Sequence, residues 1–457
     1  MRRIESSFQD PAGYMFEYDE ELFRAVNQSY KPDYDHLLSS GLYQKLVDLG
    51  LIVSFEEVDS SSFCIPGLYK VLKPLRVNFI SYPYEWAFDM LKDAALLTLK
   101  IQEIALEYGM SLKDASAFNI QFRNGKPIFI DTLSFELYPT NQPWVAYRQF
   151  CQHFLSPLAV MANVEIGLNR LFIIYIDGIP LNIATRMLPW KCRFSLGLFL
   201  HIYLHSRAQK KYEIHNGQIA NKDRKFTLAS MKVLIDSLKT TVEKQRWNSG
   251  GTEWSNYNEN GVHKKEYVEF KTKLISDWLD VLKPNVIWDL GSNDGYYSRI
   301  AEKKGIDVIS YDLDHACLNM NYVLNRQNEE SKILPLFLDL LNPSPSLGWR
   351  GTERSSFYNR NKPDLVMALA LIHHLVISGN IPLDSIAFDF SRLAEYLIIE
   401  FIPLEDEKVK ILLQKRKNYF SEYNQNQFER IFSKYYLIEK RELSFCNSRI
   451  FYLMKIK

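Results

Sequence analysis

From residue 266 to the end of the chain, continuous apolar segments alternate with segments whose apolar residues recur at helical spacing. The runs VIWDL (286–290) and VISYD (308–312) are of the first kind, and YYSRIAEKKG (296–305) and ACLNMNYVLN (316–325) are of the second. Strands that are apolar throughout are buried on both faces, as in a parallel sheet covered by helices. The pattern therefore predicts a doubly wound α/β domain over residues 266–457.

The end of the chain departs from this alternation. Further apolar strands are predicted at 333–340, 364–372 and 394–402. The last two apolar segments, 435–443 and 448–456, are separated by only a few residues, which permits a hairpin but not a crossover helix. We therefore expect a Rossmann-like, seven-stranded sheet whose last strand is antiparallel.

The first half of the chain, residues 1–212, mixes short strands with helical patterns. Because 457 residues exceed what one hydrophobic core usually organises, we expect this half to form a second, α+β domain. Its longest apolar runs, LFIIYI at 171–176 and LGLFLHIYL at 196–204, fall short of the roughly 20 residues that a membrane helix requires. We interpret both runs as core segments and expect no membrane span. Residues 213–265 are polar and rich in turn formers, which predicts a connector, and the segment FTLASMKVLIDSLKTTVEKQ predicts one helix inside it.

Charge and cysteine content narrow the class of protein. The 55 basic and 54 acidic side chains nearly cancel, so a long nucleic acid is not an expected partner. The first residues, MRRIESSFQDPAGY, lack the apolar stretch of a secretory signal, which predicts a cytoplasmic protein. The five cysteines form no C-x-x-C pair, which predicts reduced thiols with neither a disulfide nor a structural metal.

The turn after the first strand of the α/β domain reads DLGSNDG, residues 289–295. A nicotinamide-binding domain normally carries three glycines here, as G-x-G-x-x-G, whereas this turn has Asn293 where a second glycine would stand. The turn and the order of strands resemble the class I S-adenosylmethionine (SAM) dependent methyltransferases, whose pattern D-x-G-x-N/G-x-G accepts an asparagine. The resemblance implies that SAM is the cofactor.

The same resemblance implies a role for each polar residue of the site. Gly291 and Gly295 would let the turn lie against the methionine part of SAM, where a Cβ atom would clash. Asp289 would orient the turn or accept from the cofactor's ammonium group. Asp312, at the tip of the second strand, would accept from both ribose hydroxyls. Asp339, at the end of the third strand, would meet the adenine amino group.

Candidate catalytic residues follow the fourth strand in the sequence ALALIHHLVI. His373 or His374 could take the proton that an oxygen or nitrogen nucleophile releases on methylation, although one of the rings could instead cap or pack the next helix. Glu400, at the tip of the fifth strand, is a candidate for the pocket wall. Because the sulfonium of SAM is already activated, placement of the acceptor supplies most of what catalysis needs.

A wider resemblance, to bacterial methyltransferases described as related to a nodulation protein, extends over both halves. It is carried by the phrases DLLNPSPSLGW, ALALIHHL and EFIP in the second half and by ISYPYEW, LKDASAFNIQF and FIDTLSFE in the first. It implies no particular acceptor.

The first half also resembles protein kinases and aminoglycoside phosphotransferases. In LKDASAFNIQFRNGKPIFID, Asp114 would be the base for a hydroxyl acceptor, and Asn119 and Asp131 would hold magnesium. The sequence lacks the glycine-rich loop, the His-Arg before the catalytic aspartate and the V-A-I-K lysine, for which Lys70 or Lys73 could stand in. We therefore expect a kinase-like domain that is accessory and does not transfer phosphate.

The leading hypothesis is a SAM-dependent methyltransferase that modifies an oxygen or nitrogen atom of a small-molecule or glycan acceptor. Two alternatives stay open. The first is a bifunctional kinase-methyltransferase that uses Asp114, Asn119 and Asp131 for phosphotransfer. The second is a scaffold that binds SAM without turnover.

Overall fold

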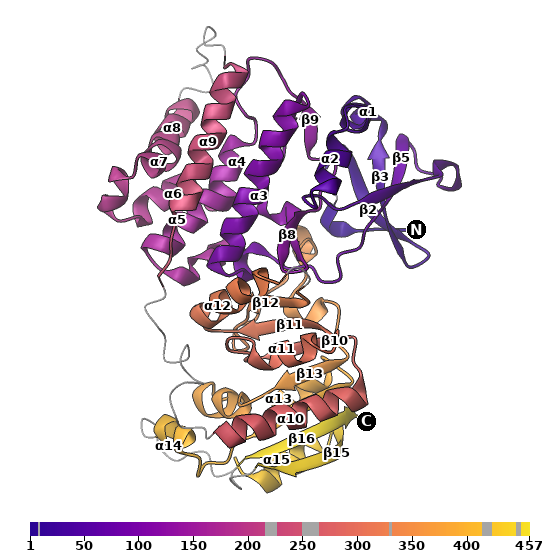
Figure 1. Cartoon of the computed structure of the whole chain (residues 1–457), viewed down its shortest axis with the longest axis vertical. Helices are drawn as coiled ribbons and strands as arrows, with labels where there is room; N and C mark the ends of the chain where they lie inside the picture. Colours follow the sequence, from indigo (N-terminus) through magenta and orange to yellow (C-terminus); the bar gives the residue numbers. More distant parts are fainter. Residues whose placement is uncertain (8–9, 215–225, 249–264, 329–330, 414–422, 445–448) are drawn as a thin grey trace. The chain divides into compact units, whose positions relative to one another are not determined.

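The computed structural model describes residues 1–7, 10–214, 226–248, 265–328, 331–413, 423–444 and 449–457 (Figure 1). The chain divides into two compact units. The first unit comprises Met1–Asn248 and Pro345–Ser355, and the second comprises Ser249–Ser344 and Ser356–Lys457. The mixed α/β class predicted from the sequence is confirmed.

The second unit is built on a seven-stranded sheet in the order β12-β11-β10-β13-β14-β16-β15. Neighbours among the first five strands in that order run parallel, whereas β16 is antiparallel to both β14 and β15. The strands are β10 (Val286–Leu290), β11 (Asp307–Asp312), β12 (Ile333–Phe337), β13 (Leu365–Ala368), β14 (Tyr396–Phe401), β15 (Tyr436–Leu443) and β16 (Ile450–Ile456).

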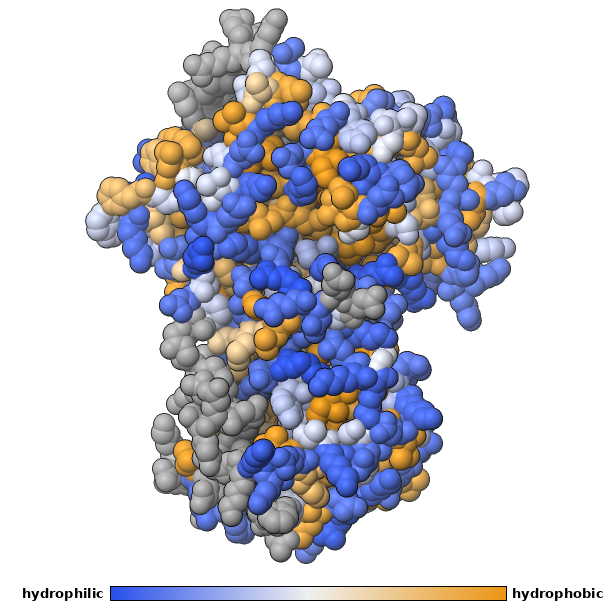
Figure 2. Space-filling model, viewed as in Figure 1, coloured by the Kyte–Doolittle hydropathy of each residue, from blue (hydrophilic) through white to orange (hydrophobic). Residues whose placement is uncertain are grey.

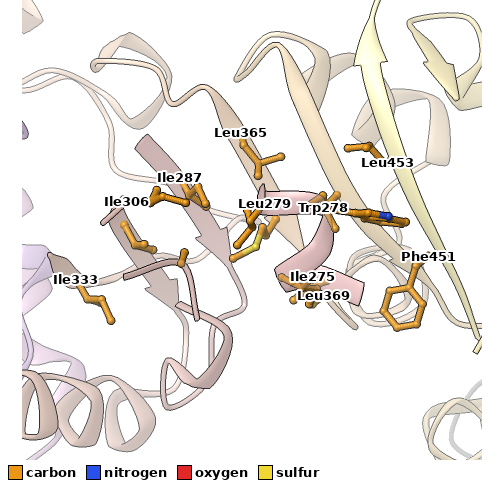
Figure 3. Close-up of a cluster of buried hydrophobic side chains, with 14 of the residues drawn as sticks. Ile275, Trp278, Leu279, Ile287, Ile306, Ile333, Leu365, Leu369, Phe451 and Leu453 are labelled. Carbon is orange, nitrogen blue, oxygen red and sulfur yellow. The ribbon is translucent and has the colours of Figure 1, made fainter. Parts of the chain in front are cut away.

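Helices connect and cover these strands. They are α10 (Lys265–Leu282), α11 (Tyr296–Glu302), α12 (His315–Arg326), α13 (Leu383–Ser391), α14 (Glu407–Leu413) and α15 (Gln425–Phe432), with a π-helical turn, η12, at His374–Ser378. Helix α10 buries one side, which carries Ile275, Trp278 and Leu279, in a cluster with strand residues such as Ile287 and Leu365 (Figure 3). Each such aliphatic side chain contributes about 1.5–3 kcal/mol when fully buried, so this cluster holds the helix on the sheet.

The first unit begins with a five-stranded antiparallel sheet in the order β1-β2-β3-β5-β4. Two-stranded sheets β6-β9 and β7-β8 lie further along the chain. The strands are β1 (Arg2–Arg3), β2 (Gly13–Tyr18), β3 (Glu21–Asn27), β4 (Phe55–Val58), β5 (Leu68–Pro74), β6 (Met110–Leu112), β7 (Ile120–Arg123), β8 (Lys126–Phe129) and β9 (Phe135–Leu137).

The helices of the first unit include α3, most of whose residues are buried and which contacts α2, α5 and α9. They are α1 (Lys31–Ser39), α2 (Leu42–Asp48), α3 (Phe88–Glu107), α4 (Tyr147–Phe150), α5 (Ser156–Asn163), α6 (Leu181–Met187), α7 (Leu196–Leu198), α8 (His205–Ile214) and α9 (Leu228–Lys244), with π-helical segments η6 (Cys151–Leu155) and η9 (Phe199–Leu204) and short 3-10 helices that include η5 (Ala117–Asn119) and η8 (Trp190–Phe194).

The helix predicted inside the connector is α9, and it belongs to the first unit. Its apolar residues Met231, Ile235 and Leu238 are buried, and the helix contacts α3 and α7. The first unit therefore extends to Asn248, beyond the boundary at 212 that composition suggested, because polarity at a helix surface resembles polarity in a linker. The remaining connector residues, 215–225 and 249–264, lie outside the described residues.

Residues Pro345–Ser355 form a tongue that leaves the second unit and returns to it. At its base the N–H of Phe357 donates to the carbonyl of Ser344 (3.0 Å). Within the tongue, Leu347 and Arg354 form an isolated antiparallel bridge. Leu347 packs on the buried cluster of Tyr82, Tyr84 and Phe172 in the first unit. Arg354 lies over the ring of Phe118 (4.2 Å), and Ser355 N–H donates to the Tyr82 hydroxyl (2.8 Å). The tongue thus packs on the first unit and belongs to it by its contacts.

The interpretation of 196–204 as a core segment is right for only one side of that helix. Leu198 and Ile202 are buried, but Leu196, Leu200 and Leu204 are exposed. An all-apolar helical run hides which side faces the core, because its periodicity has no polar positions to mark it. In the described part of the chain, no helix has the length and apolar character needed to cross a membrane.

The cysteines in the described residues are free thiols. They are Cys64, Cys151, Cys192 and Cys317, and Cys446 lies outside the described residues.

Candidate functional site

The turn between β10 and α11 contains three residues in the left-handed region. These are Gly291 (φ +74°), Asn293 (φ +53°) and Gly295 (φ +80°). Asparagine adopts this conformation more readily than most residues, which accounts for its place between the glycines. A Cβ atom at Gly295 would lie 2.4 Å from Oδ1 of Asn321, so Gly295 is needed both for the backbone conformation and for the approach of α12.

Asp312 ties this turn to the tip of β11. Its Oδ2 accepts from the N–H of Asn293 (2.7 Å), and its Oδ1 accepts from the N–H of Asp314 (2.8 Å). The N–H groups of Gly291 and Ser292 both donate to the carbonyl of Tyr311 (2.9 Å each). Burial raises the pKa of Asp312 to about 6, against the effect of the N–H donors. The sheet therefore brings Asp312 and the predicted turn into contact, because β10 and β11 are parallel neighbours.

Asp289 lies beneath the turn at the end of β10 and is buried. Ser298 Oγ donates to its Oδ2 (2.6 Å), which fixes α11 on the strand. Burial raises the pKa of Asp289 to about 6, although Ser298 and the charge of Lys271 lower it. Of the two roles implied for Asp289, this contact fits orientation of the turn.

Asp339 follows the next strand, β12, and is partly exposed. Its Oδ1 accepts from the N–H of Leu341 (2.9 Å), and its carbonyl accepts from the N–H of Asn342 (3.0 Å). The strand itself ends at Phe337, so Asp339 belongs to the turn that leaves the sheet. It lies at the same carboxyl edge of the sheet as Asp289 and Asp312, as the parallel register requires.

His373 and His374 follow β13 in a short helix. Their ring centroids are 4.1 Å apart. His373 is buried, whereas His374 is partly exposed. Because a general base must reach its substrate, the geometry distinguishes two residues that the sequence treats alike.

Glu400, which the sequence suggested for the pocket wall, instead takes part in a buried ionic network. Its carboxylate pairs with Lys271 (2.7 Å) and Arg449 (3.4 Å) and accepts from the Tyr267 hydroxyl. Arg449 also pairs with Asp406 (2.9 Å). Burial opposes ionisation of Glu400, but the two cations outweigh it and lower its pKa to about 2.

Sequence reasoning missed Lys271 in this network. The residue lies on the buried side of α10, four residues from both Tyr267 and Ile275, and its own burial lowers its pKa. Its ammonium also lies over the ring of Tyr297 (4.5 Å). The available signal was a lysine at an apolar position of an amphipathic helix, where a charge needs a partner.

In the first unit, the three residues predicted for phosphotransfer meet near the start of β7. Asp114 accepts from Ser116 N–H (2.9 Å) and Gln149 Nε2 (2.8 Å), and Asn119 donates to Ser134 Oγ (3.2 Å). Burial raises the pKa of Asp114, and the charge of Asp131 adds to that shift. The spacing seen in the sequence therefore does correspond to a cluster.

Asp131, however, is bound by a residue that the sequence did not reveal. Arg24, from β3, pairs with Asp131 and also with Asp10 (3.3 Å). Lys70 and Lys73, the candidates to stand in for the missing lysine, form ion pairs with Glu57 and Glu21, each at 2.6 Å. Within the described ranges, no group of three or more His, Cys, Asp or Glu side chains is arranged to hold a metal ion.

Comparison with known proteins gives one extended sequence match. No family model matches the chain. The chain is 33% identical over 438 residues to the nodulation protein NoeA of Rhizobium meliloti (strain 1021), which covers 93% of this chain and 90% of that protein. This match confirms the predicted resemblance to nodulation-protein relatives.

Solved structures show weaker similarity. Magnesium protoporphyrin IX methyltransferase (ChlM) from Synechocystis PCC 6803, with bound SAH, has 14% identity and a TM-score of 0.32, covering 45% of this chain and 93% of that chain. The bifunctional kinase-methyltransferase WbdD has 17% identity and a TM-score of 0.30, covering 45% of this chain and 42% of that chain.

Proposed function

The chain belongs to the family of the nodulation protein NoeA, and from that premise and the carboxylates of its second unit we propose that it is a SAM-dependent methyltransferase. The observation that carries the proposal is the contact between the 291–295 turn and Asp312. This contact lies at the carboxyl edge of the sheet. There β10 and β13 are neighbours although β11 and β12 lie between them in the chain, so the strand order reverses at β10. Open α/β sheets bind ligands outside such a switch point.

The carboxylates around the turn favour SAM over a dinucleotide. Asp289, Asp312 and Asp294 gather negative charge around the turn, and the charge of Asp294 is among those acting on Asp289. A pyrophosphate would be repelled by these carboxylates, whereas a ribose diol and an ammonium group would be attracted. The absence of the G-x-G-x-x-G pattern points the same way.

In this proposal each residue has a defined task. Asp312 would accept from the ribose hydroxyls with the lone pairs that its two N–H donors leave available. Asp339 would accept from the adenine amino group, and the 291–295 turn would lie against the methionine part, with Asp289 holding it in place. SAM, when bound, supplies an electrophilic methyl group. The partly exposed His374 is the better placed of the two histidines to take a proton from the acceptor.

The proposed acceptor is a small molecule or a glycan with an oxygen or nitrogen nucleophile, in the cytoplasm. The near-neutral charge of the chain supports an acceptor other than a long nucleic acid. The second unit would carry the chemistry, and the first would serve as an accessory domain.

Calorimetric titration tests the cofactor assignment directly. We expect the full chain to bind SAM with measurable heat and to give none with NAD⁺ at the same concentration. Heat with NAD⁺ and none with SAM would overturn the assignment. Binding of SAM without methylation of any acceptor in a panel of sugars and amines would favour the scaffold alternative.

The affinity for SAM should depend on pH through the aspartates of the site. Because Asp289 and Asp312 have pKa values of about 6 and accept hydrogen bonds best when ionised, affinity should rise from about pH 5 to about pH 7 and then level off. The chain without SAM should become less stable over that interval, since both pKa values lie above the ordinary 3.8 and the folded state holds these protons more tightly. Titrations at a series of pH values, with thermal unfolding alongside, measure both. A flat affinity profile over this interval would contradict the prediction.

For the first unit we propose a kinase-like domain without phosphotransfer. The cluster of Asp114, Asn119 and Asp131 supports the likeness, and the pairing of Asp131 with Arg24 supports the loss of activity. A carboxylate already paired with a guanidinium is a poor ligand for magnesium.

Titration with ATP and magnesium should therefore give no heat, on the same sample that binds SAM. Magnesium-dependent binding of ATP that disappears in Asp131→Asn would contradict this expectation and favour the bifunctional alternative.

A further inference from the structure

The first unit exposes an apolar strip along residues 190–204, which we call the Trp190 strip. It consists of five side chains from η8, α7 and η9, which are Trp190, Phe194, Leu196, Leu200 and Leu204. Trp190 is 72% exposed, Phe194 77% and Leu196 72%. Figure 2 shows hydrophobic residues on the surface of the first unit around α7 and α8. Large exposed apolar side chains gathered in one place mark an interaction surface.

The strip is rigidly supported from within. Leu198 and Ile202, on the opposite side of the same helical run, are buried. His201 contacts the Tyr147 hydroxyl through Nδ1 and Ser237 Oγ through Nε2, each at 2.8 Å. A Cβ atom at Gly197 would lie 2.0 Å from Oγ1 of Thr241, so the helix also lies close against α9. The exposed leucines therefore belong to the outer face of a fixed helix.

The stretch of chain that carries the strip is strongly one-sided in charge. Between Asp177 and Glu213 the sequence contains six Lys and Arg residues and no Asp or Glu, in a chain whose net charge is only +1. Lys191 and Arg193 are exposed between Trp190 and Phe194. Cationic side chains that alternate with Trp, Phe and Leu at a surface are the pattern of interfacial membrane binding.

We propose that the Trp190 strip docks the protein on the surface of an anionic phospholipid bilayer. Tryptophan and phenylalanine would enter the boundary between headgroups and acyl chains, and the leucines of α7 and η9 would follow them. Lys191 and Arg193 would pair with lipid phosphates. The docking is peripheral and reversible, since a short strip gains far less apolar burial than a spanning helix. The charge complementarity selects a bilayer over a second copy of the chain, because two copies would bring these cations together.

Cosedimentation with vesicles tests the proposal. The full chain should bind vesicles of equal parts phosphatidylcholine and phosphatidylglycerol, bind weakly to phosphatidylcholine alone, and lose binding as salt is raised. Trp190→Ser combined with Phe194→Ser should lower the partition coefficient at least about tenfold. Lys191→Glu combined with Arg193→Glu should remove the preference for the anionic vesicles.

The control variant is Trp349→Ser, which removes a tryptophan that is 64% exposed but lies outside the strip, and it should bind as the parent does. Thermal unfolding checks that each variant is folded. Equal binding to neutral and anionic vesicles, or no binding to either, would overturn the proposal. So would light scattering that shows the parent as a dimer and the Trp190/Phe194 variant as a monomer, since a second copy would then cover the strip.

Discussion

Replacing Asp312 by asparagine should lower the affinity for SAM by a factor of about 100 or more, because hydrogen bonds to a charged acceptor contribute about 1.5–3 kcal/mol each and two would be weakened. The substitution keeps the size of the side chain but removes its charge. It also weakens the acceptor for Asn293 N–H, which holds the turn in place. Calorimetric titration of the full chain measures the change.

The matched control is Asp307→Asn. Asp307 begins the same strand, at the opposite edge of the sheet, and its carboxylate is 3.7 Å from Lys332 on the surface. This variant should bind SAM as the parent does. Equal affinities in the Asp312 and Asp307 variants would place the cofactor away from the tip of β11.

Replacing Glu400 by glutamine should destabilise the second unit by about 3–5 kcal/mol, the range for breaking a buried pair and leaving its partner charged. Lys271 would stay buried without the carboxylate that now pairs with it, and Arg449 would keep only its pair with Asp406. Because the pKa of Glu400 is about 2, against an ordinary value of 4.5, this stabilisation is fully present above pH 4.5 and is lost as the pH falls through 2. Scanning calorimetry near neutral pH measures the loss.

Glu395→Gln provides the comparison for this experiment. Glu395 pairs with Lys455 (3.2 Å) just before the same strand, and its side chain is 55% exposed. Exposed pairs contribute at most about 1 kcal/mol. If the two substitutions lower the free energy of unfolding equally, the prediction that the charge of Glu400 stabilises the fold through its buried pairs is wrong.

The strands of the second unit were predictable where apolar runs coincide with single elements. The predictions for 286–290 and 308–312 match β10 and β11 closely, and both are confirmed. The predicted strand 364–372 was too long, because β13 ends at Ala368 and Ala370 turns with a φ of +53°. The apolar run continues through that turn into the following helix, so hydrophobicity alone could not place the end.

The site was predictable to the extent that it is local in sequence. Turn residues and the tips of successive parallel strands meet by topology, so Asp312 could be placed beside the turn without coordinates. The pairing of Lys271 with Glu400 joins positions 129 residues apart, and no periodicity encodes it. Arg24 likewise sits between apolar residues of β3, and only the fold shows that Asp131 is its partner.

The tongue of Pro345–Ser355 limits how parts of this chain can be exchanged for parts of a relative. The two units are built from four stretches of polypeptide, since the chain returns to the first unit after it has begun the second. A simple end-to-end fusion of two genes would not create this arrangement. Leu347 packs on aromatic residues that lie far before it in the chain, at Tyr82, Tyr84 and Phe172. Exchanging the stretch after Asn248 for a relative's would therefore also replace the tongue that packs on this cluster.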